Sequence, residues 1–161
     1  MSSLCSPWKT IRLGTGLRNV EDFCRAINGA GCKINDWASD IISKPAFSAS
    51  TKEVEVDLVV RSTADLGFPK GACRKDIYAR AQELGFGLCP AEVGPQLRLQ
   101  YSDQPKRDWL LIAMEPIVGS VGLCRILIVG RHDHSPWIDA EDGSSNSYWF
   151  HYIKWIFCLQ K

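Results

Sequence analysis

The sequence predicts one α+β domain, in which about three helices pack on a mainly antiparallel sheet. Helical patterns cluster in the first half of the chain and strand patterns in the second, and this segregation favours α+β over an alternating α/β fold. The chain has 161 residues, of which 45% are hydrophobic and 23% are charged, as in an ordinary globular protein of one domain. We therefore expect a single domain over residues 1–161, with residues 1–7 as a flexible tail.

Capping and turn residues mark the first elements. Residues 8–13 are expected to form a short strand, after which two glycines force a turn. Asn19 is a suitable N-cap for a helix that later glycines end. A second short helix is expected to begin after Asn35 and to end before Pro45, because the residue before a proline resists the α region.

The clearest strand and the clearest helix come next. Residues 53–61 alternate between polar and apolar side chains, which predicts a strand with one face on the core and the other in solvent. Residues 73–84 repeat apolar side chains at helical spacing, so a helix is expected there, with Gly85 ending it.

The second half is expected to be rich in strands. Residues 97–101 alternate and predict a strand, joined by a hairpin loop to a continuous apolar run at 109–114. Another apolar strand is expected at 124–130, and a long polar loop at 135–147. Residues 149–159 predict a closing strand with two apolar faces. Such a strand must be central in the sheet or covered by another chain, because an exposed apolar edge promotes aggregation.

Charge and composition exclude several kinds of partner. The chain has 19 basic and 18 acidic side chains, whereas binding to nucleic acid usually requires a basic excess. No apolar run approaches the roughly 20 residues of a membrane span. The first seven residues lack the basic and apolar regions of a signal peptide. The seven cysteines form no C-x-x-C pair and are odd in number. We expect a cytoplasmic protein without nucleic-acid or membrane partners and without a cofactor.

Two segments in the middle of the chain resemble a known family. Residues 88–101, LCPAEVGPQLRLQY, and residues 109–117, WLLIAMEPI, resemble a family of small uncharacterised bacterial proteins, some of which are carried as integron gene cassettes. The same family is matched by three shorter segments, at 36–38, 44–47 and 78–81. The likeness fades after Ile117, and only the aromatic ending at 155–157 fits again. No activity is assigned to the family, so the resemblance implies kinship without a function.

The segment from residue 88 to residue 117 holds the main candidates for a ligand site. If it forms a hairpin, its two strands bring polar side chains next to aromatic ones, which is how small-molecule pockets are built. The ligand-binding candidates are Glu92, Arg98, Gln100, Tyr101, Trp109 and Glu115. A competing interpretation is a solvated sheet face on which Arg98 pairs with a glutamate, which contributes little to stability at a surface.

Other motifs are compatible with chemistry but have simpler explanations. Gly14 and Gly16 follow a strand and precede a helix, as in a phosphate-binding loop, but the third glycine is missing. His132 and His134 would point the same way on a strand and are the metal candidates, but no third ligand has a defined spacing, so no metal is predicted. Cys89 has mostly apolar neighbours, which raise the pKa of a thiol and disfavour a nucleophile.

The helices expected at 19–28 and 35–43 also suggest a helix-turn-helix. The second of them would enter the DNA groove, but it carries Asp36 and Asp40, and acidic side chains repel phosphate. Two helices that simply pack together are the favoured interpretation.

Two functions of different classes follow from these observations. The first is a non-catalytic binding or interaction protein that forms a homo-oligomer through an aromatic surface and also binds a small-molecule ligand. The oligomer interface candidates are Trp149, Tyr152 and Trp155. The alternative is a small-molecule enzyme that uses Glu92 or Glu115 as general acid or base beside Arg98.

Overall fold

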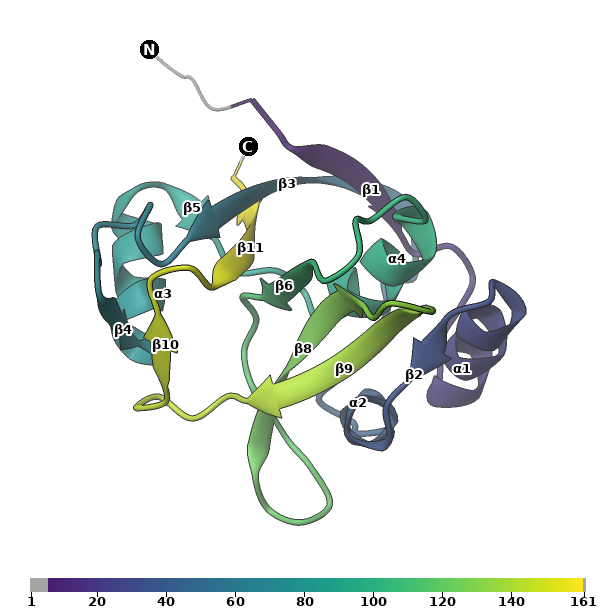
Figure 1. Ribbon diagram of the computed structural model, residues 1–161. Coiled ribbons are helices and arrows are strands. Elements are labelled where there is room, and N and C mark those ends of the chain that lie inside the picture. The colour runs from purple at the N-terminus through teal and green to yellow at the C-terminus, as the bar shows by residue number, and fades with distance from the viewer. Residues whose placement is uncertain (1–5, 161) are drawn as a thin grey trace.

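The computed structural model describes residues 6–160 and contains helices and a large curled sheet (Figure 1). The four helices within these residues are α1 (Val20–Gly29), α2 (Asp36–Ile42), α3 (Arg74–Glu83) and α4 (Val93–Gln100). The strands of the first half are β1 (Lys9–Leu13), β2 (Lys33–Ile34), β3 (Val54–Ser62), β4 (Gly71–Cys73) and β5 (Phe86–Gly87). Those of the second half are β6 (Trp109–Ile112), β7 (Ile117–Val118), β8 (Cys124–Arg131), β9 (Pro136–Asp142), β10 (Tyr148–Phe150) and β11 (Lys154–Leu159).

The main sheet is mostly antiparallel. Its strands run in the order β1-β3-β11-β6-β8-β9-β2, while β5 pairs with β11, β7 pairs with β8, and β10 and β4 form a separate two-stranded sheet. The β11–β6 and β2–β9 pairs are parallel. The expected combination of helices with a mainly antiparallel sheet is confirmed, with four helices in place of about three. Residues 1–5 of the expected tail lie outside the described residues.

The caps expected from the sequence are formed. The Asn19 side chain accepts a hydrogen bond of 2.9 Å from the Asp22 amide at the start of α1. The Asn35 side chain accepts one of 2.7 Å from the Trp37 amide at the start of α2. Both caps satisfy amides that have no partner inside the helix. The strand at 53–61 and the helix at 73–84 are also confirmed, as β3 and α3.

The strand expected at residues 97–101 is wrong, because residues 97–100 belong to α4 and Tyr101 caps its end. Pro95 lies in the first turn of this helix, where the missing amide hydrogen costs nothing. The polar side chains at positions 96 and 98 are buried, so the alternation does not mark a solvent-exposed strand face. The helix lies against β8, and a Cβ atom at Gly94 would be only 2.6 Å from Leu127 Cδ1. Without a strand here, the central hairpin at 88–117 does not form.

Two further expectations about the second half are corrected. The long loop expected at 135–147 contains β9, whose register with β8 runs from Arg131↔Pro136 to Arg125↔Asp142. The single closing strand expected at 149–159 is divided into β10 and β11 by a turn. The alternative in which this segment is central in the sheet is confirmed for β11, which lies between β3 and β6. Its residues Trp155, Ile156 and Phe157 are fully buried.

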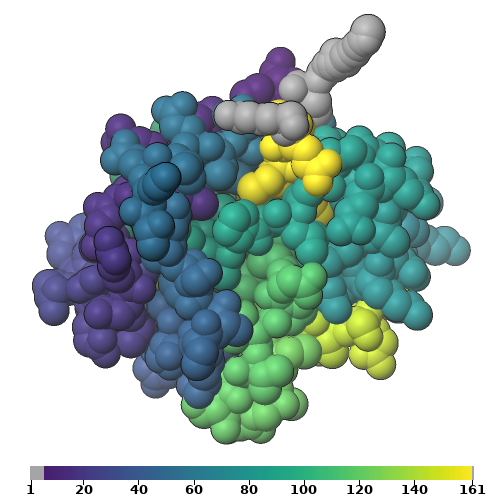
Figure 2. Space-filling view, turned by 180° about the vertical axis from the view of Figure 1, so that it is seen from behind, coloured from purple at the N-terminus to yellow at the C-terminus, as the bar shows by residue number. Residues whose placement is uncertain are grey.

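The hairpin of β7 and β8 projects from the body of the molecule (Figure 1), and it forms the lower edge of the view from behind (Figure 2). It is tied to α2 by Asp40, whose carboxylate accepts hydrogen bonds from the Ser120 amide (2.8 Å) and hydroxyl (2.5 Å). These bonds lower the pKa of the Asp40 carboxyl. Within residues 6–160, no helix combines the length and the apolar character needed to cross a membrane.

Candidate functional site

An open cleft of about 570 Å³ lies on one face of the sheet, within the size range of small-molecule sites. Its apolar lining consists of Trp37, Trp109, Leu111, Ile128, Trp149 and Ile153, with Ala140 between polar neighbours. Its polar lining consists of Asn35, Arg125, Asp139 and Glu141. We call this the tryptophan cleft, after the three tryptophans contributed by α2, β6 and β10.

The register of three neighbouring strands forms the floor of the tryptophan cleft. Leu111 on β6 pairs with Ile128 on β8, which pairs with Asp139 on β9. Two residues along each strand, Trp109 pairs with Gly130, and side chains two positions apart share a face. A Cβ atom at Gly130 would lie 2.0 Å from Trp109 Cε3, so the tryptophan ring lies across this glycine. Gly130 is therefore needed for the position of Trp109.

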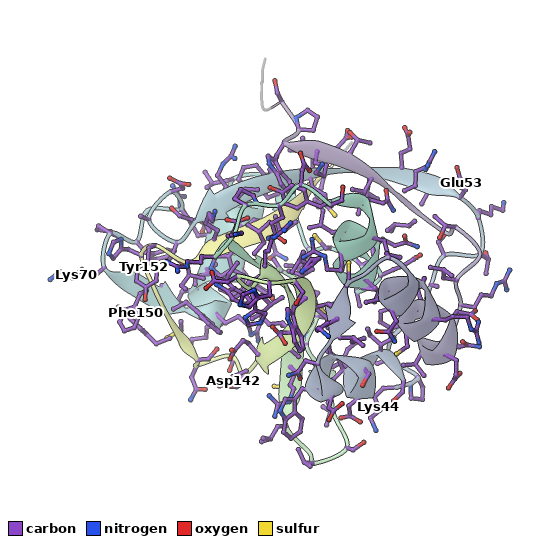
Figure 3. The ribbon with its side chains drawn as sticks, turned by 45° about the vertical axis from the view of Figure 1, so that its right-hand side comes forward. Lys44, Glu53, Lys70, Asp142, Phe150 and Tyr152 are labelled. Carbon is purple, nitrogen blue, oxygen red and sulfur yellow. The ribbon has the colours of Figure 1, made fainter. Side chains whose placement is uncertain are left out.

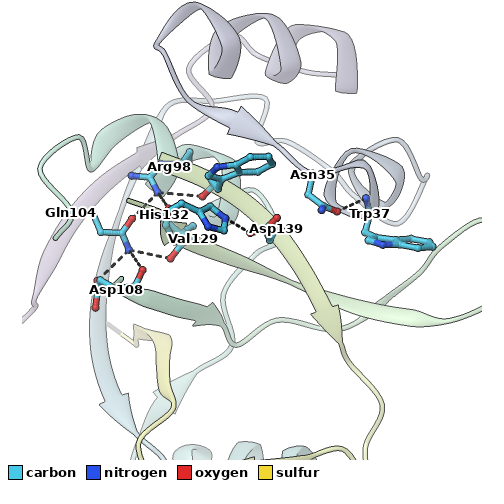
Figure 4. Close-up of polar contacts among 10 residues, drawn as sticks. Asn35, Trp37, Arg98, Gln104, Asp108, Val129, His132 and Asp139 are labelled. Atoms are coloured by element: carbon cyan, nitrogen blue, oxygen red, sulfur yellow. Dashed lines mark hydrogen bonds and ion pairs between the residues drawn. The ribbon is translucent and has the colours of Figure 1, made fainter. Parts of the chain in front are cut away.

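A histidine lies between two tryptophans at one end of the cleft. The His132 ring is edge-to-face with Trp109, at 4.8 Å between centroids, and with Trp137, at 5.1 Å. Its Nε2 atom is 3.8 Å from Oδ2 of Asp139 (Figure 4). Burial raises the pKa of the Asp139 carboxyl, and the neighbouring His132 opposes this shift to a smaller extent. The carboxylate of Asp139 is thus poorly solvated and only partly compensated.

A guanidinium group lies over the tryptophan at the helical wall. The Cζ atom of Arg125 is 4.1 Å from the centroid of the Trp37 ring, which is the geometry of a cation–π contact. Trp37 is the second residue of α2, and its amide is bonded by the Asn35 cap (Figure 4). The Nε atom of Arg125 is buried and has no hydrogen-bond partner among the described residues. This hydrogen-bond donor is therefore unsatisfied.

The third tryptophan wall comes from the two-stranded sheet. Trp149 pairs with Ala72 of β4, and its Nε1 atom donates a 3.1 Å hydrogen bond to the Ser147 hydroxyl. Its ring is edge-to-face with the buried Trp155 at 5.6 Å. These contacts hold the indole of Trp149 against the core while leaving part of it facing the cleft.

Glu92, a predicted ligand-binding residue, is instead part of the folded framework. Its side chain is 1% exposed. It accepts hydrogen bonds from the Gly14 amide (2.9 Å), the Ser50 amide (2.8 Å) and the Gln96 side chain (3.0 Å). The carboxylate thus occupies the glycine turn that could have bound a phosphate, and the Gly14 amide is not free for a ligand. Gln100 has a similar structural role, because its amide group bonds the backbone of Arg12 on β1 in both directions.

Arg98 is also buried, at 1% exposure, and its terminal nitrogens donate to carbonyl oxygens of neighbouring segments (Figure 4). The acceptors are Gln104 Oε1 (2.6 Å), Tyr101 O (2.7 Å), Gly130 O (2.8 Å) and Trp137 O (3.2 Å). These bonds join α4 to the following loop and to β8 and β9. Burial lowers the pKa of the Arg98 guanidinium. No carboxylate of the described chain forms an ion pair with Arg98, so the Arg98–glutamate pair of the competing interpretation is not formed.

The six predicted ligand residues do not meet in one pocket. Tyr101 packs edge-on against Trp8 at 5.2 Å and beneath the Lys9 ammonium at 4.7 Å. Glu115 is exposed at a different cleft of about 500 Å³, next to Cys89. Among the six, only Trp109 lines the tryptophan cleft. The arrangement of Glu92 or Glu115 beside Arg98, expected for an acid–base enzyme, is therefore not assembled.

The remaining candidates are also separated. Within the described residues, no group of three histidine, cysteine, aspartate or glutamate side chains could hold a metal ion, and His132 faces Asp139 while His134 is exposed. The prediction for Cys89 is confirmed, since burial raises the pKa of its thiol. The six cysteines in the described part of the chain are all free.

Only one of the interface candidates is well exposed. Tyr152 is 63% exposed and lies on the outer surface near Phe150 and Lys70 (Figure 3). Trp149 is half-buried and lines the cleft. Trp155 is 0% exposed, so its assignment to an interface is wrong: it packs edge-on against Tyr78 of α3 inside the core.

Several residues of the tryptophan cleft were missed from the sequence. Asp139 and Glu141 fall in the segment expected to be a loop. A signal was present, because Trp137, Asp139 and Glu141 alternate with the less polar Ile138 and Ala140, which is a strand pattern. Trp37 and Arg125 gave no local signal, because their contact joins segments that are distant in the sequence.

Comparisons with protein-family models, with curated proteins and with solved structures found no match to this chain.

Proposed function

We propose that this protein binds a small organic molecule in the tryptophan cleft. The observation that carries the proposal is the convergence of Trp37, Trp109 and Trp149 from three separate segments around one opening. Exposing indole rings to solvent is unfavourable, and concave apolar walls with a few polar groups are typical of ligand sites. Asp139 supplies a carboxylate whose nearest basic group in the described chain, His132, lies 3.8 Å away.

A thermal-shift screen of small organic compounds of varied charge tests this proposal. A ligand at one hundred times its dissociation constant stabilises the folded state by about 2.7 kcal/mol, which raises the Tm of a chain of this length by roughly 5–10 °C. The shift should be lost in Trp109→Leu. It should persist in Trp8→Leu, a matched control whose ring packs outside the cleft against Tyr101.

The proposal fails if no compound in such a library raises the Tm. It also fails if a bound compound stabilises Trp109→Leu and the parent protein equally. Circular dichroism of the unliganded variants shows whether both retain the fold, so that loss of binding is not confused with unfolding.

Self-association is a second proposal, and one observation favours it. Tyr148, Phe150 and Tyr152 are between 54% and 63% exposed, and their rings contact one another. We estimate that these rings expose roughly 300–400 Å², whereas a standard interface buries about 800 Å² on each partner. A homo-oligomer would therefore centre on these rings and include the surrounding polar surface.

Light scattering at high protein concentration tests self-association. The expected result is a mass above the 18.0 kDa of one chain that returns to this value in Phe150→Ser. Val118→Ser is the matched control, because Val118 is equally exposed but lies on the projecting hairpin. A parent protein that is monomeric at all concentrations would contradict the proposal.

A further inference from the structure

The charged groups around the tryptophan cleft are predominantly acidic. The carboxylates of Asp139 and Glu141 and the guanidinium of Arg125 line it, which gives two acidic groups to one basic group. The positive charge is already engaged, because it lies over the Trp37 ring at 4.1 Å. Asp139 pairs with Ile128 of β8, and Arg125 lies three residues before Ile128 on the same strand. The backbone of Arg125 is therefore roughly 10 Å from that of Ile128 along β8.

Asp139 is the more buried of the two carboxylates that line the cleft. Within the described chain its nearest basic group is His132, at 3.8 Å between Nε2 and Oδ2, which is longer than a normal hydrogen bond. Burial disfavours the charged form of this carboxyl and raises its pKa. A positive charge brought within about 4–6 Å would favour the charged form, so an incoming cation would replace the solvation that the fold removes.

An aromatic wall that suits a cation borders the same end of the cleft. The Trp109 ring lies across Gly130 and is edge-to-face with His132. The Nε2 atom of His132 is in turn 3.8 Å from the Asp139 carboxylate (Figure 4). Cations are attracted to the electron-rich faces of tryptophan rings, and desolvated sites strengthen the attraction. Trp109 and Asp139 thus provide an aromatic face and a carboxylate at one place.

We propose that the ligand of the tryptophan cleft is an organic cation: an amine or a quaternary ammonium group carried on an apolar body. Its charged group lies beside Asp139 and against Trp109, and its apolar body contacts Leu111, Ile128 and Trp149. This inference rests on the proposed ligand-binding function and adds the charge class of the ligand.

Three probes that share one ring and differ only in charge test the inference: benzylamine as the cation, benzyl alcohol as the neutral compound and benzoate as the anion. Binding is followed by isothermal titration calorimetry at pH 7. We expect benzylamine to bind at least tenfold more tightly than benzyl alcohol, and benzoate to bind most weakly. Asp139→Asn should weaken benzylamine about tenfold and leave benzyl alcohol unchanged.

Asp133→Asn is the matched control, because Asp133 is an exposed aspartate of the same β8–β9 hairpin that pairs with Arg107 outside the cleft. It should bind all three probes as the parent protein does. If Asp139→Asn fails to fold, Glu141→Gln removes the second carboxylate and should also weaken benzylamine selectively.

The other outcomes separate the inference from the proposed function. If the three probes bind equally well, or if benzoate binds most tightly, the proposal that the ligand is a cation is wrong. Either result leaves the proposal of ligand binding in the cleft intact. Absence of binding by all three probes also overturns the proposal that the ligand is an organic cation. The wider thermal-shift screen then decides independently whether the cleft binds any ligand. Loss of benzylamine binding in both aspartate variants would show that the effect is not specific to Asp139.

Discussion

Replacing Tyr78 with phenylalanine should destabilise the protein strongly, although the change removes one oxygen atom. The Tyr78 hydroxyl donates a 2.9 Å hydrogen bond to the Met114 carbonyl and accepts a 3.0 Å bond from the Met114 amide. Both residues are buried, so water cannot replace the lost partner. An unsatisfied buried donor or acceptor costs about 1–3 kcal/mol. Two such groups are left, and we expect the free energy of unfolding to fall by about 2–4 kcal/mol.

Urea denaturation at pH 7 measures this loss. With a slope of about 2 kcal/mol per molar urea, the midpoint should fall by about 1–2 M. Tyr152→Phe is the matched control, because Tyr152 is 63% exposed and surface substitutions usually change stability by less than about 0.5 kcal/mol.

Because of Tyr78, we also expect the stability of the protein to depend on pH in the alkaline range. Burial is the main cause that raises the pKa of Tyr78 to about 12, and the hydrogen bond to Met114 opposes it. The unfolded chain loses this proton near pH 10. Stability that depends on the protonated hydroxyl is therefore complete below pH 10 and is lost as the pH rises toward 12. At pH 11 the loss amounts to about 1.4 kcal/mol.

Tyr78→Phe has no such proton, so the stability difference between parent and variant should narrow by about 1.4 kcal/mol between pH 8 and pH 11. Other groups titrate in this range, but they contribute equally to both proteins and cancel in the difference. A difference that is constant with pH, or a Tyr78→Phe variant as stable as Tyr152→Phe, would refute the assignment of a buried, doubly bonded hydroxyl.

Three further predictions concern the framework and the cleft. Arg98→Met should lower the free energy of unfolding by about 3–5 kcal/mol in chemical denaturation, because the carbonyls around the guanidinium lose their donors; an unchanged midpoint would contradict the structural role. Gly130→Ala should weaken any cleft ligand by at least tenfold in calorimetry, because the new Cβ atom displaces Trp109; an unchanged affinity would exclude Trp109 from the site. Asp40→Asn should lower the Tm at pH 7, because the hydrogen bonds from Ser120 depress the pKa of the carboxyl. This stabilisation is present above the unfolded pKa and is lost as the pH falls through the lowered pKa of the folded state, so the Tm difference should shrink in acid. A Tm difference that does not shrink as the pH falls below 3.8 would contradict it.

The sequence predicted best those elements that are set by local interactions. Asn19 and Asn35 each bond an amide two or three residues ahead, so neighbouring residues contain the information for both caps. The alternation at 53–61 also predicts β3 correctly, although burial in the strand does not alternate and the neighbours Leu58 and Val59 are both buried. In each of these cases the signal lies within a short stretch of the sequence.

The error at α4 depends on distant partners. Leu97 and Leu99 alternate with polar residues over too short a stretch to distinguish a strand from a helix. The helix α4 allows the buried side chains of Gln96 and Arg98 to donate hydrogen bonds to acceptors in segments that are distant in the sequence. The error at β9 has another cause: its side chains alternate as in a strand and its partner β8 is adjacent in the sequence, but its charged residues resemble those of a loop.

A similar reason explains why the candidate site in the structure differs from the one predicted from the sequence. Glu92 and Arg98 attracted a functional interpretation because of their residue types, but the fold has already used their hydrogen-bonding capacity on its own backbone. A group can serve a ligand only if the folded chain leaves its charge or its hydrogen bonds incompletely satisfied. Asp139 meets that condition beside the tryptophans of the cleft, which makes the tryptophan cleft the stronger candidate.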